Sequence, residues 1–464
     1  MSQHLLARAA GTLSQRTVQQ IETSQLLHAI QAAPGIQFDG SDNGTTASSY
    51  QAQAKLPDDN EKSSTWAHKA GVNCLTIDRF EGRYMLSGGS DSSILLWDLE
   101  SVSGTTRAST YSPVGKADKT SSSHKFGITQ LSFYPFDSQA FLSSSYDHTL
   151  KLYATETLAV SASFNLDSIL YSHASSPIAD HLLVACASQH PAVRLVDLRS
   201  GANAHSLAGH QGAVLSVAWS PKDEFVLASG GLDDTVRLWD IRSSASCLGV
   251  LDLEDSVGMG GEDGFGSKAR ARTHGRAHTG PCNGVVWKDD GAVIVTSGHD
   301  ERVRVWDVAT GANTLAHFGP IIKNTNLSIL LPLLVPTYVG KTGEGFMLYP
   351  NEKEILMFDL FEGTLLKRLR IPEINVAQAK GAAGQRSIRN RVTSLCWRAG
   401  NIEYYSAHSD GLIRAWKPQT KAELELDREE AEIVFDSEDN ERKRKRQVLD
   451  DMFRDLTKQK ITFT

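Results

Sequence analysis

Short segments of alternating hydrophobic and polar residues, separated by turns rich in glycine, serine and aspartate, recur along most of the chain. Residues 81–100, EGRYMLSGGSDSSILLWDLE, show the pattern: MLSGG and ILLWD flank a turn that contains Asp91. Alternation with a period of two over about five residues predicts a β-strand with one buried face. The pattern therefore predicts an all-β region built from small sheets.

The turn residue and an aromatic residue keep a fixed distance in five copies of this pattern. An Asp lies six residues before the aromatic, and a hydroxyl residue lies four residues before the Asp. A His precedes the aromatic by 29 positions in three copies and by 28 in a fourth, whereas the last copy has residues 387–390 there. The copies are His68, Ser87, Asp91 and Trp97; His124, Ser143, Asp147 and Tyr153; His210, Ser229, Asp233 and Trp239; His278, Thr296, Asp300 and Trp306; and Ser406, Asp410 and Trp416.

Repeats of about 40 to 45 residues with several short strands each are typical of the four-stranded blades of a β-propeller. The aromatic residue falls on the predicted third strand. Two weaker units, residues 192–198 and 354–360, complete the set, and the second has Phe358 in the aromatic position. The sequence therefore predicts a seven-bladed propeller over residues 66–418, and its repeat resembles the WD-repeat family. In that family an N-terminal strand usually closes the ring, and residues 60–68 are expected to supply it.

The recurring polar residues suit a structural role. A Trp on the third strand carries an indole N–H into a crowded sheet, where a Ser or Thr hydroxyl links it to the His ring, and the Asp accepts from that ring. Loss of one member would leave others unpaired, at a cost of about 1 to 3 kcal/mol each. Ser, His and Asp also form catalytic triads, but four of them in four repeats indicate structure, so no enzyme activity is predicted.

The region before the propeller divides into two predicted segments. Residues 1–33 are rich in helix formers, with Val18 and Ile21 at helical spacing, and they predict a helix-loop-helix. Residues 34–65 are rich in Gly, Ser, Asp and Gln without periodicity and predict a flexible linker. Two roles are open for the helices: they dock in a partner's groove, or they pack on the chain's own propeller.

Three further segments are polar. Residues 101–123 and 254–276 are predicted surface loops, and the GMGGEDGFGS stretch of the second does not match the GxGxxG of a phosphate-binding loop. Residues 419–464 form a charged C-terminal extension with a helical pattern near its end. Its basic run is a candidate nuclear localisation signal, with a phosphate-contacting patch or a solvated face as alternatives. The run comprises Arg442, Lys443, Arg444, Lys445 and Arg446.

Composition narrows the function classes. A formal net charge of -7 argues against direct DNA contact through a broad basic surface. The five cysteines are scattered without a CxxC pair, so neither a disulfide framework nor a zinc site is predicted, and a reducing compartment fits best. The longest hydrophobic run, residues 327–335, is interrupted by Pro332 and is too short to cross a membrane. No cofactor, metal site or membrane segment is predicted.

Two consecutive blades end their third strand with a similar motif. Residues 239–242 read WDIR, and residues 196–199 read VDLR, with Val in place of Trp. Equivalent positions in neighbouring blades lie on one face of a propeller, so Arg199 and Arg242 are expected side by side. The simple alternative is that each arginine is solvated or paired with the adjacent aspartate, which contributes only about 0 to 1 kcal/mol.

Paired WDxR ends resemble the signature of substrate receptors for cullin-RING ubiquitin ligases. That resemblance implies docking on the large subunit of the damaged-DNA-binding adaptor, with a tethered N-terminal helix-loop-helix inserted into the adaptor. It also implies that no reaction is catalysed by this chain. The implied adaptor contacts are Leu5, Leu6, Leu13, Val18 and Ile21 from the helices, with Asp197, Arg199, Asp240 and Arg242 from the ring.

Four segments narrow the resemblance to the Cockayne syndrome group A family. They are EGRYMLSGGSD (81–91), LSSSYDHTLKLY (142–153), YSHASSP (171–177) and GHQGAVLSVAWSP (209–221). The resemblance implies a ubiquitin-ligase substrate receptor that is located in the nucleus and acts in transcription-coupled nucleotide excision repair. Its implied partners are a group B-like ATPase and a stalled RNA polymerase II assembly, whose ubiquitylation it directs. The alternative is a WD-repeat scaffold in a nuclear chromatin or RNA-processing complex without a ligase.

Overall fold

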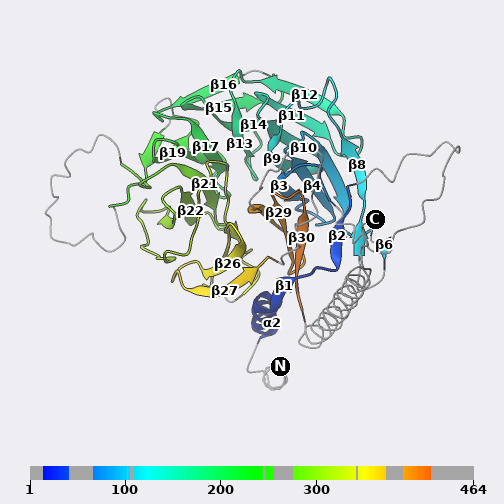
Figure 1. The fold of residues 1–464 in the computed structure, drawn as a ribbon. Helices are drawn as coiled ribbons and strands as arrows, with labels where there is room; N and C mark the ends of the chain where they lie inside the picture. Colours follow the sequence, from blue (N-terminus) through cyan, green and yellow to red (C-terminus); the bar gives the residue numbers. More distant parts are fainter. Residues whose placement is uncertain are drawn as a thin grey trace, which may run out of the picture. The chain divides into compact units, whose positions relative to one another are not determined.

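The described residues of the computed structural model form seven sheets arranged in a ring, together with one small additional sheet (Figure 1). They are residues 14–40, 66–101, 103–104, 109–201, 203–243, 247–254, 275–340, 343–371 and 390–419. The chain divides into two compact units, Met1–Lys417 and Pro418–Thr464. None of the described helices is long and apolar enough to cross a membrane.

In blades one to six the antiparallel strands come in sequence order, so local connections suffice to build them, whereas blade seven takes its fourth strand from the N-terminal region. We number the blades in chain order. They are β3 (Val72–Ile77), β4 (Tyr84–Gly89), β5 (Ile94–Asp98) and β8 (Pro113–Ala117) in blade one; β9 (Ile128–Tyr134), β10 (Asp137–Ser145), β11 (Thr149–Ala154) and β12 (Val160–Asn165) in blade two; β13 (Leu170–Ser175), β14 (Leu183–Ser188), β15 (Ala192–Asp197) and β16 (Asn203–Ala208) in blade three; β17 (Val214–Trp219), β18 (Val226–Gly231), β19 (Val236–Asp240) and β20 (Cys247–Val250) in blade four; β21 (Cys282–Trp287), β22 (Val293–Gly298) and β23 (Arg302–Asp307) in blade five; β24 (Leu333–Leu334), β25 (Phe346–Pro350), β26 (Glu354–Asp359) and β27 (Leu365–Arg370) in blade six; and β28 (Val392–Trp397), β29 (Tyr404–His408), β30 (Ile413–Pro418) and β1 (Ile30–Ala32) in blade seven.

The seven-bladed propeller predicted from the repeat is confirmed. The motif aromatics lie on the third strands and are at most 1% exposed. Val196 and Phe358, in the two weaker units, occupy equivalent positions on β15 and β26 and are fully buried. Hydrophobic side chains of adjacent blades pack against one another, as in the cluster that combines Val217 of blade four with Val193 of blade three. The core therefore lies between the sheets all around the ring.

The ring is closed by a different segment from the one predicted. We expected residues 60–68 to close it, but the fourth strand of blade seven is β1, which pairs with β30. Residues 66–68 form no strand, and residues 60–65 lie outside the described part of the chain. The three-residue strand β1 follows a helix directly, and Ile30 is 1% exposed within the blade core. It was not predicted, because three residues are too few to show a strand pattern and the helix-forming sequence runs directly into them.

The predicted linker is partly structured. β2 (Ile36–Phe38) pairs in parallel with β7 (Ser109–Tyr111), which also pairs with β6 (Ser103–Gly104). Phe38 stacks on Tyr111 with ring centroids 5.0 Å apart and contacts Trp97 edge to face at 5.3 Å. The prediction of a loop over residues 101–123 is likewise wrong, because that segment supplies β6, β7 and β8. Aromatic burial, rather than strand propensity, holds this sheet to the ring.

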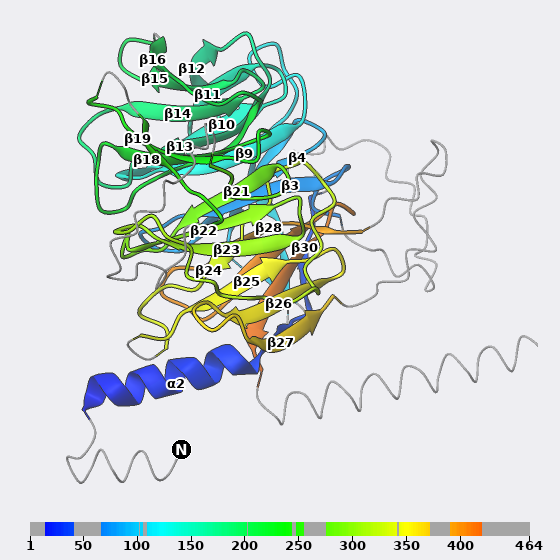
Figure 2. The same ribbon diagram turned by 90° about the vertical axis from the view of Figure 1, so that its left-hand side faces the viewer.

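α2 (Gln15–Ala29) precedes β1 and lies beside blade six, below β27 in Figure 2. Ser14 caps the helix, since its Oγ accepts a hydrogen bond from the Thr17 backbone N–H at 3.1 Å. The helix ends at Ile30, which already has an extended backbone. Of the predicted helix-loop-helix, residues 1–13 lie outside the described residues, as do residues 255–274 and 420–464.

The ring has two faces with different connections. Because the strands of a blade are antiparallel, the links from first to second and from third to fourth strand share one face. We call it the arginine face, since residues 198–200 and 241–243 follow third strands there. Turns from second to third strand and the links between blades lie on the other face, which we call the turn face.

Candidate protein-binding surface

Three blades contain a complete hydrogen-bond chain from indole to carboxylate. In blade four the Trp239 indole N–H donates to Ser229 Oγ at 2.7 Å, and that Oγ lies 2.7 Å from Nε2 of His210. Nδ1 of His210 lies 3.0 Å from the Asp233 carboxylate. Blade five repeats the arrangement with His278, Thr296, Asp300 and Trp306. Blade one repeats it with His68, Ser87 and Trp97, but there the histidine reaches Asp91 through Ser93, whose Oγ lies 2.8 Å from Nδ1 of His68 and donates to Asp91 at 2.6 Å. The hydroxyls are committed to these bonds and buried, so they are not positioned as nucleophiles.

A glycine at the end of the second strand makes room for the hydrogen-bond chain of side chains. A Cβ at Gly231 would lie 2.6 Å from Nδ1 of His210 and 2.5 Å from the Asp233 carboxylate. Burial raises the pKa of Asp233, but the hydrogen bond from His210 and the charge of that ring more than offset this, so the pKa lies below its usual range. The carboxylate therefore stays ionised at neutral pH and holds the ring in place.

Blade two has the residue spacing of the motif but not the complete hydrogen-bond chain. His124 Nδ1 lies 2.9 Å from Asp147, whereas His124 Nε2, Ser143 Oγ and the Tyr153 hydroxyl have no partner among the described residues. Tyr153 stacks on Phe141 with ring centroids 5.0 Å apart. A phenol carries no N–H at the position of the indole nitrogen, so it cannot donate to the serine. The prediction that this serine joins the chain is wrong for blade two.

Blade seven builds its chain from a different histidine. The Trp416 indole donates to Ser406 Oγ at 2.8 Å, and Ser406 Oγ lies 2.8 Å from Nε2 of His408. His408 occupies the position that is glycine in blades one, four and five, so its own ring fills the space that the glycine leaves open. Asp410 instead accepts from Asn390 at 2.7 Å and from Arg414 at 2.9 Å. A His two residues after the hydroxyl was the sequence signal for this arrangement.

Arg242 is exposed but fixed in position. Its Nε and Nη2 donate to the two carboxylate oxygens of Asp240 at 3.0 and 2.8 Å, and its backbone N–H donates to the same carboxylate at 3.0 Å. The guanidinium also lies 4.8 Å from the centroid of the Phe225 ring. The side chain remains 63% exposed. A bidentate pair over an aromatic ring pre-organises the guanidinium for a partner on the arginine face.

Arg199 has no such support. Its backbone N–H donates to Asp197 Oδ1 at 3.0 Å, but the other carboxylate oxygen accepts from Ser200 Oγ at 2.9 Å. Within the described part of the chain, no side chain hydrogen-bonds the exposed Arg199 guanidinium. The two arginines, which the sequence treats alike, therefore differ in how they are held.

His181 connects the two segments that carry the arginines, residues 198–200 and 241–243, which we call the arginine ends. His181, from the link between β13 and β14, approaches the Glu224 backbone oxygen of blade four with Nε2 at 2.9 Å. The neighbouring residue Leu182 accepts a backbone hydrogen bond from Leu198, just before Arg199. Phe225 accepts one from Ile241, just before Arg242. Both ends therefore lie on one face and are joined through His181, whose ring also lies 5.0 Å from the Trp219 ring and 6.0 Å from the Phe225 ring.

The C-terminal half of α2 is anchored on the same face. Thr23 Oγ1 accepts from the Gly340 backbone N–H at 3.3 Å, and the His28 ring contacts Phe346 edge to face at 6.0 Å. Gly340 lies in the link between β24 and β25, and Phe346 begins β25. Lys367 Nζ donates to the His28 and Ile30 backbone oxygens at 2.8 and 2.7 Å. Two roles were open for the helix, and its C-terminal half adopts the second: it packs on the chain's own propeller.

The predicted helix contacts are only partly exposed. Val18 is 2% exposed, so it does not project toward a partner, and Ile21 is half-buried. The prediction of Val18 as an adaptor contact is wrong for this conformation, because helical periodicity does not distinguish burial on the own chain from burial on a partner. Leu26 is 43% exposed and was not predicted. Leu5, Leu6 and Leu13 lie outside the described residues, as do Arg442, Lys443, Arg444, Lys445 and Arg446.

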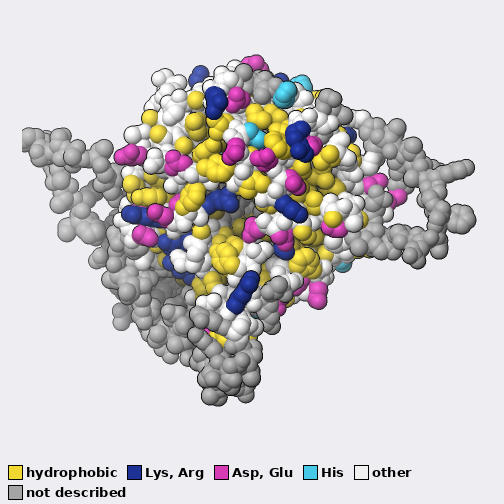
Figure 3. Space-filling view, turned by 180° about the vertical axis from the view of Figure 1, so that it is seen from behind, with side chains coloured by type: hydrophobic (Ala, Val, Ile, Leu, Met, Phe, Trp, Pro, Cys, Tyr) yellow, Lys and Arg dark blue, Asp and Glu magenta, His cyan; other side chains and the backbone are white. Residues whose placement is uncertain are grey.

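Four cysteine thiols are buried, and the described part of the chain holds no cluster of metal-ligating side chains. Burial raises the pKa of the thiols of Cys74, Cys186, Cys282 and Cys396 to about 12, which leaves them protonated. The described residues contain no group of three or more metal-ligating side chains. Figure 3 shows one face of the ring, where basic and acidic side chains are interspersed with hydrophobic ones around a central hollow. Such a mixed surface suits protein partners.

Comparison with known proteins agrees with this architecture. The family model "WD domain, G-beta repeat" matches residues 60–98, 115–154, 201–240 and 271–307. The WD repeat-containing protein ATCSA-1 of Arabidopsis thaliana is 28% identical over 82% of this chain and 92% of its own length. Radiation-sensitive protein 28 of Saccharomyces cerevisiae is 26% identical over 42% of each chain. The ribosome biogenesis protein ytm1 of Aspergillus niger is 28% identical over 52% of this chain and 53% of its own.

Proposed function

We propose that this WD-repeat protein is the substrate-recognition subunit of a cullin-RING ubiquitin ligase that acts in transcription-coupled nucleotide excision repair. It docks on the large subunit of the damaged-DNA-binding adaptor through the arginine face. Its substrates belong to a stalled RNA polymerase II assembly that includes a Cockayne syndrome group B-like ATPase. The likeness to ATCSA-1 supports the assignment because it extends over 82% of the chain and is not confined to the four segments that match the family model.

The shared face of α2 and the paired arginine ends carries this proposal. One adaptor can contact both only if they point the same way, and the Gly340, Phe346 and His181 contacts give them that arrangement. Arg242 contributes most, because its guanidinium is already fixed by Asp240 and Phe225, so binding orders little more of it. Arg199 contributes less, since it must be immobilised on binding.

The protein acts without chemistry of its own. It holds a substrate close to a ubiquitin-charged enzyme elsewhere in the ligase and so raises the effective concentration of the reacting groups. The residues that looked like catalytic triads are structural members of the blades. We also propose a nuclear location, supported by the basic run at residues 442–446.

A second candidate is a scaffold without a ligase, in a nuclear chromatin or RNA-processing complex. The likeness to the ribosome biogenesis protein ytm1 over 52% of this chain favours it. That likeness covers a smaller part of the chain than the likeness to ATCSA-1. Copurification separates the two: the ligase predicts a cullin, and the scaffold predicts pre-ribosomal proteins in its place.

The proposed docking is tested with purified adaptor subunit by biolayer interferometry. Two variants remove the contacts separately: Arg242→Ala, and deletion of residues 1–13. The deletion stops before Ser14, because β1 closes the ring and must stay. Arg302→Ala is the matched control, since Arg302 is exposed at the start of β23 on the turn face. We expect about tenfold weaker binding or more in each test variant and no change in the control. Undiminished binding in both test variants refutes the docking.

A further inference from the structure

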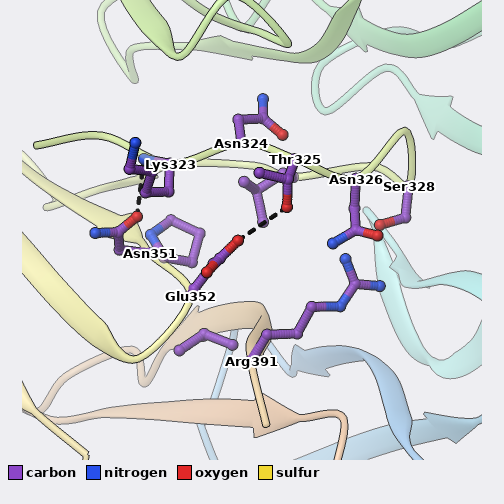
Figure 4. Close-up of a pocket in the computed structure, with 11 residues that line it drawn as sticks. Lys323, Asn324, Thr325, Asn326, Ser328, Asn351, Glu352 and Arg391 are labelled. Carbon is purple, nitrogen blue, oxygen red and sulfur yellow. Dashed lines mark hydrogen bonds between the residues drawn. The ribbon is translucent and has the colours of Figure 1, made fainter. Parts of the chain in front are cut away.

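The turn face carries a small pocket between blades five, six and seven (Figure 4). It is open to solvent, and its space of about 270 Å³ includes part of that solvent, so it suits one side-chain group rather than a whole ligand. Its walls come from the link before β24, the turn between β25 and β26, and the first residues of blade seven. It is therefore separate from α2 and the arginine ends.

The walls of the pocket are held rigid by an amide network. Asn324 and Asn283 exchange side-chain hydrogen bonds at 2.8 and 3.1 Å, and Asn324 also donates to the Gly298 backbone oxygen at 2.9 Å. Asn351 accepts from the Lys323 backbone N–H at 2.9 Å and donates to the Ile321 backbone oxygen at 3.2 Å. These asparagines are buried, so the link is fixed before any ligand arrives.

Arg391 is the unpaired cation of this pocket. In the described part of the chain its guanidinium makes no hydrogen bond or ion pair, although it is only partly exposed. In Figure 4 it points toward Asn326 and Ser328. Burial lowers its pKa, which reflects the cost of holding this charge away from water. Partly desolvated cations are normally paired, so an unpaired one indicates a missing anion.

The charge of the lining favours a carboxylate. Lys323 and Arg391 are the lining cations, and Glu352, which interacts electrostatically with Arg391, is the lining anion. The Glu352 carboxylate already accepts from Thr325 Oγ1 at 2.9 Å, and Lys323 already pairs with Glu301 at 3.2 Å. The charge of Lys323 is thereby balanced, whereas the Arg391 guanidinium still lacks a hydrogen-bonded anion among the described residues, and a single carboxylate supplies one with the least added negative charge. A doubly charged phosphate would leave an excess of negative charge beside Glu352.

An aromatic side chain lies near the cation, and a second one follows from the neighbouring loop. Tyr146, in the turn between β10 and β11, interacts electrostatically with Arg391 and is 39% exposed. Phe126, which precedes β9, is 61% exposed, and its backbone oxygen accepts from Ser145 Oγ next to Tyr146. A peptide whose acidic side chain reaches Arg391 thus finds hydrophobic surface for its neighbouring residues.

We propose that this pocket binds an Asp or Glu side chain of an acidic peptide segment in a partner protein, with Arg391 as the carboxylate-binding residue. The guanidinium offers two parallel N–H donors that match a carboxylate. Asn326 and Ser328 supply further polar groups at the rim. The site goes beyond the proposed adaptor docking and lies on the other face, so each can fail without the other.

The test is fluorescence anisotropy with the full chain and a fluorescein-labelled nonapeptide of three consecutive acidic residues between glycines and serines. Its counterpart with glutamine and asparagine in their place reports on charge, and a phosphoserine version reports on phosphate. We expect the acidic peptide to bind below about 1 mM and the amide peptide at least about tenfold more weakly. Equal binding of the acidic and amide peptides, or no binding of the acidic one, overturns the site. Tighter binding of the phosphoserine peptide overturns the carboxylate assignment.

Two variants locate the binding. Arg391→Gln removes the charge without breaking any side-chain bond, and Ser328→Trp fills the pocket; each is expected to weaken binding at least about tenfold. Arg199→Gln, on the arginine face, is the matched control and leaves peptide binding unchanged. Wild-type affinity in both pocket variants contradicts the proposal. Arg391→Gln keeps full adaptor affinity and Arg242→Ala keeps full peptide affinity, so failure of this site is distinguished from failure of the proposed ligase role.

Discussion

Blades three and four end in nearly the same motif, yet they are held together differently. Blade four carries a buried chain from Trp239 to Asp233, and its Arg242 is clamped to Asp240. Blade three has Val196 in place of the tryptophan, within a cluster of hydrophobic side chains from blades two and three, and its Arg199 is unsupported. A blade therefore forms without the polar chain. The fixed orientation of Arg242 comes from Asp240 and Phe225 and not from the polar chain, whose Asp233 lies in the turn on the other face.

The buried histidines of the two blades show the same contrast. His210 of blade four faces the Asp233 carboxylate. His173 of blade three lies between two hydroxyls, with Nε2 2.8 Å from Ser132 and Nδ1 2.9 Å from Ser144. Burial lowers the pKa of His173 to about 3, because no carboxylate offsets the loss of solvation. Blade three thus holds a neutral histidine, which makes it sensitive to acid.

The largest effect on stability is expected from interrupting the hydrogen-bond chain of blade four. His210→Ala leaves Ser229 and Asp233 without their main partner and opens a cavity, so the free energy of unfolding should fall by about 3 kcal/mol. Urea denaturation followed by tryptophan fluorescence measures it. Tyr153→Phe is the matched control in blade two: it removes a buried hydroxyl without a partner and should change stability by less than about 0.5 kcal/mol. Equal losses in the two variants would show that the polar chain contributes nothing specific.

The second effect is the response of His173 to acid. Its pKa is depressed in the folded state, so the unfolded chain binds the proton more readily and stability falls as the pH drops below about 6.5. The loss continues toward the folded pKa of about 3. His173→Gln should flatten the decline in the free energy of unfolding between pH 6.5 and 5 by about 1.6 kcal/mol. An unchanged pH profile in that variant would mean that other groups cause the decline.

The third effect compares the two arginines in adaptor binding. Arg242→Ala removes a pre-organised contact and should weaken binding about tenfold, whereas Arg199→Ala should weaken it about twofold. Isothermal titration calorimetry with the purified adaptor subunit measures both. The reverse ranking would show that pre-organisation by Asp240 and Phe225 does not decide the contribution.

The smallest effect on adaptor affinity is expected from weakening the bidentate pair between Asp240 and Arg242. Asp240→Asn weakens the bidentate pair while leaving Arg242 in place, so adaptor affinity should fall about threefold. Stability should change by less than about 0.5 kcal/mol, because the arginine is largely exposed and such surface pairs contribute little. Thermal unfolding of the same variant checks the second point. A loss of affinity equal to that of Arg242→Ala would mean that Asp240 contacts the adaptor directly.

Much of the ring was predictable from the sequence because its signals are local and repeated. The spacing from Ser229 to Trp239 fixes two neighbouring strands and their register, and five copies of it define most blades. Val196 and Phe358 were recognised as third-strand positions by their place in the repeat alone. Such features depend on residues that are close in the chain.

The rest depends on residues that are far apart in the chain. β1 pairs with β30 across almost the whole sequence, and β2 is fixed by Phe38 packing on Tyr111, so neither has a local signal. The pocket around Arg391 combines three separate links, and its significance comes from the absence of a bonded partner in the described residues. The His181 bridge between the arginine ends is equally non-local.

Hydrogen–deuterium exchange of the full chain with and without the purified adaptor subunit tests the central claim most directly. The claim is that one face of the ring presents both α2 and the two arginine ends. We predict that the adaptor slows exchange in Gln15–Ala29 and in residues 198–200 and 241–243, and leaves residues 323–328 and 351–353 unchanged. Protection confined to the turn-face segments, or no protection at the arginine face, would contradict the account.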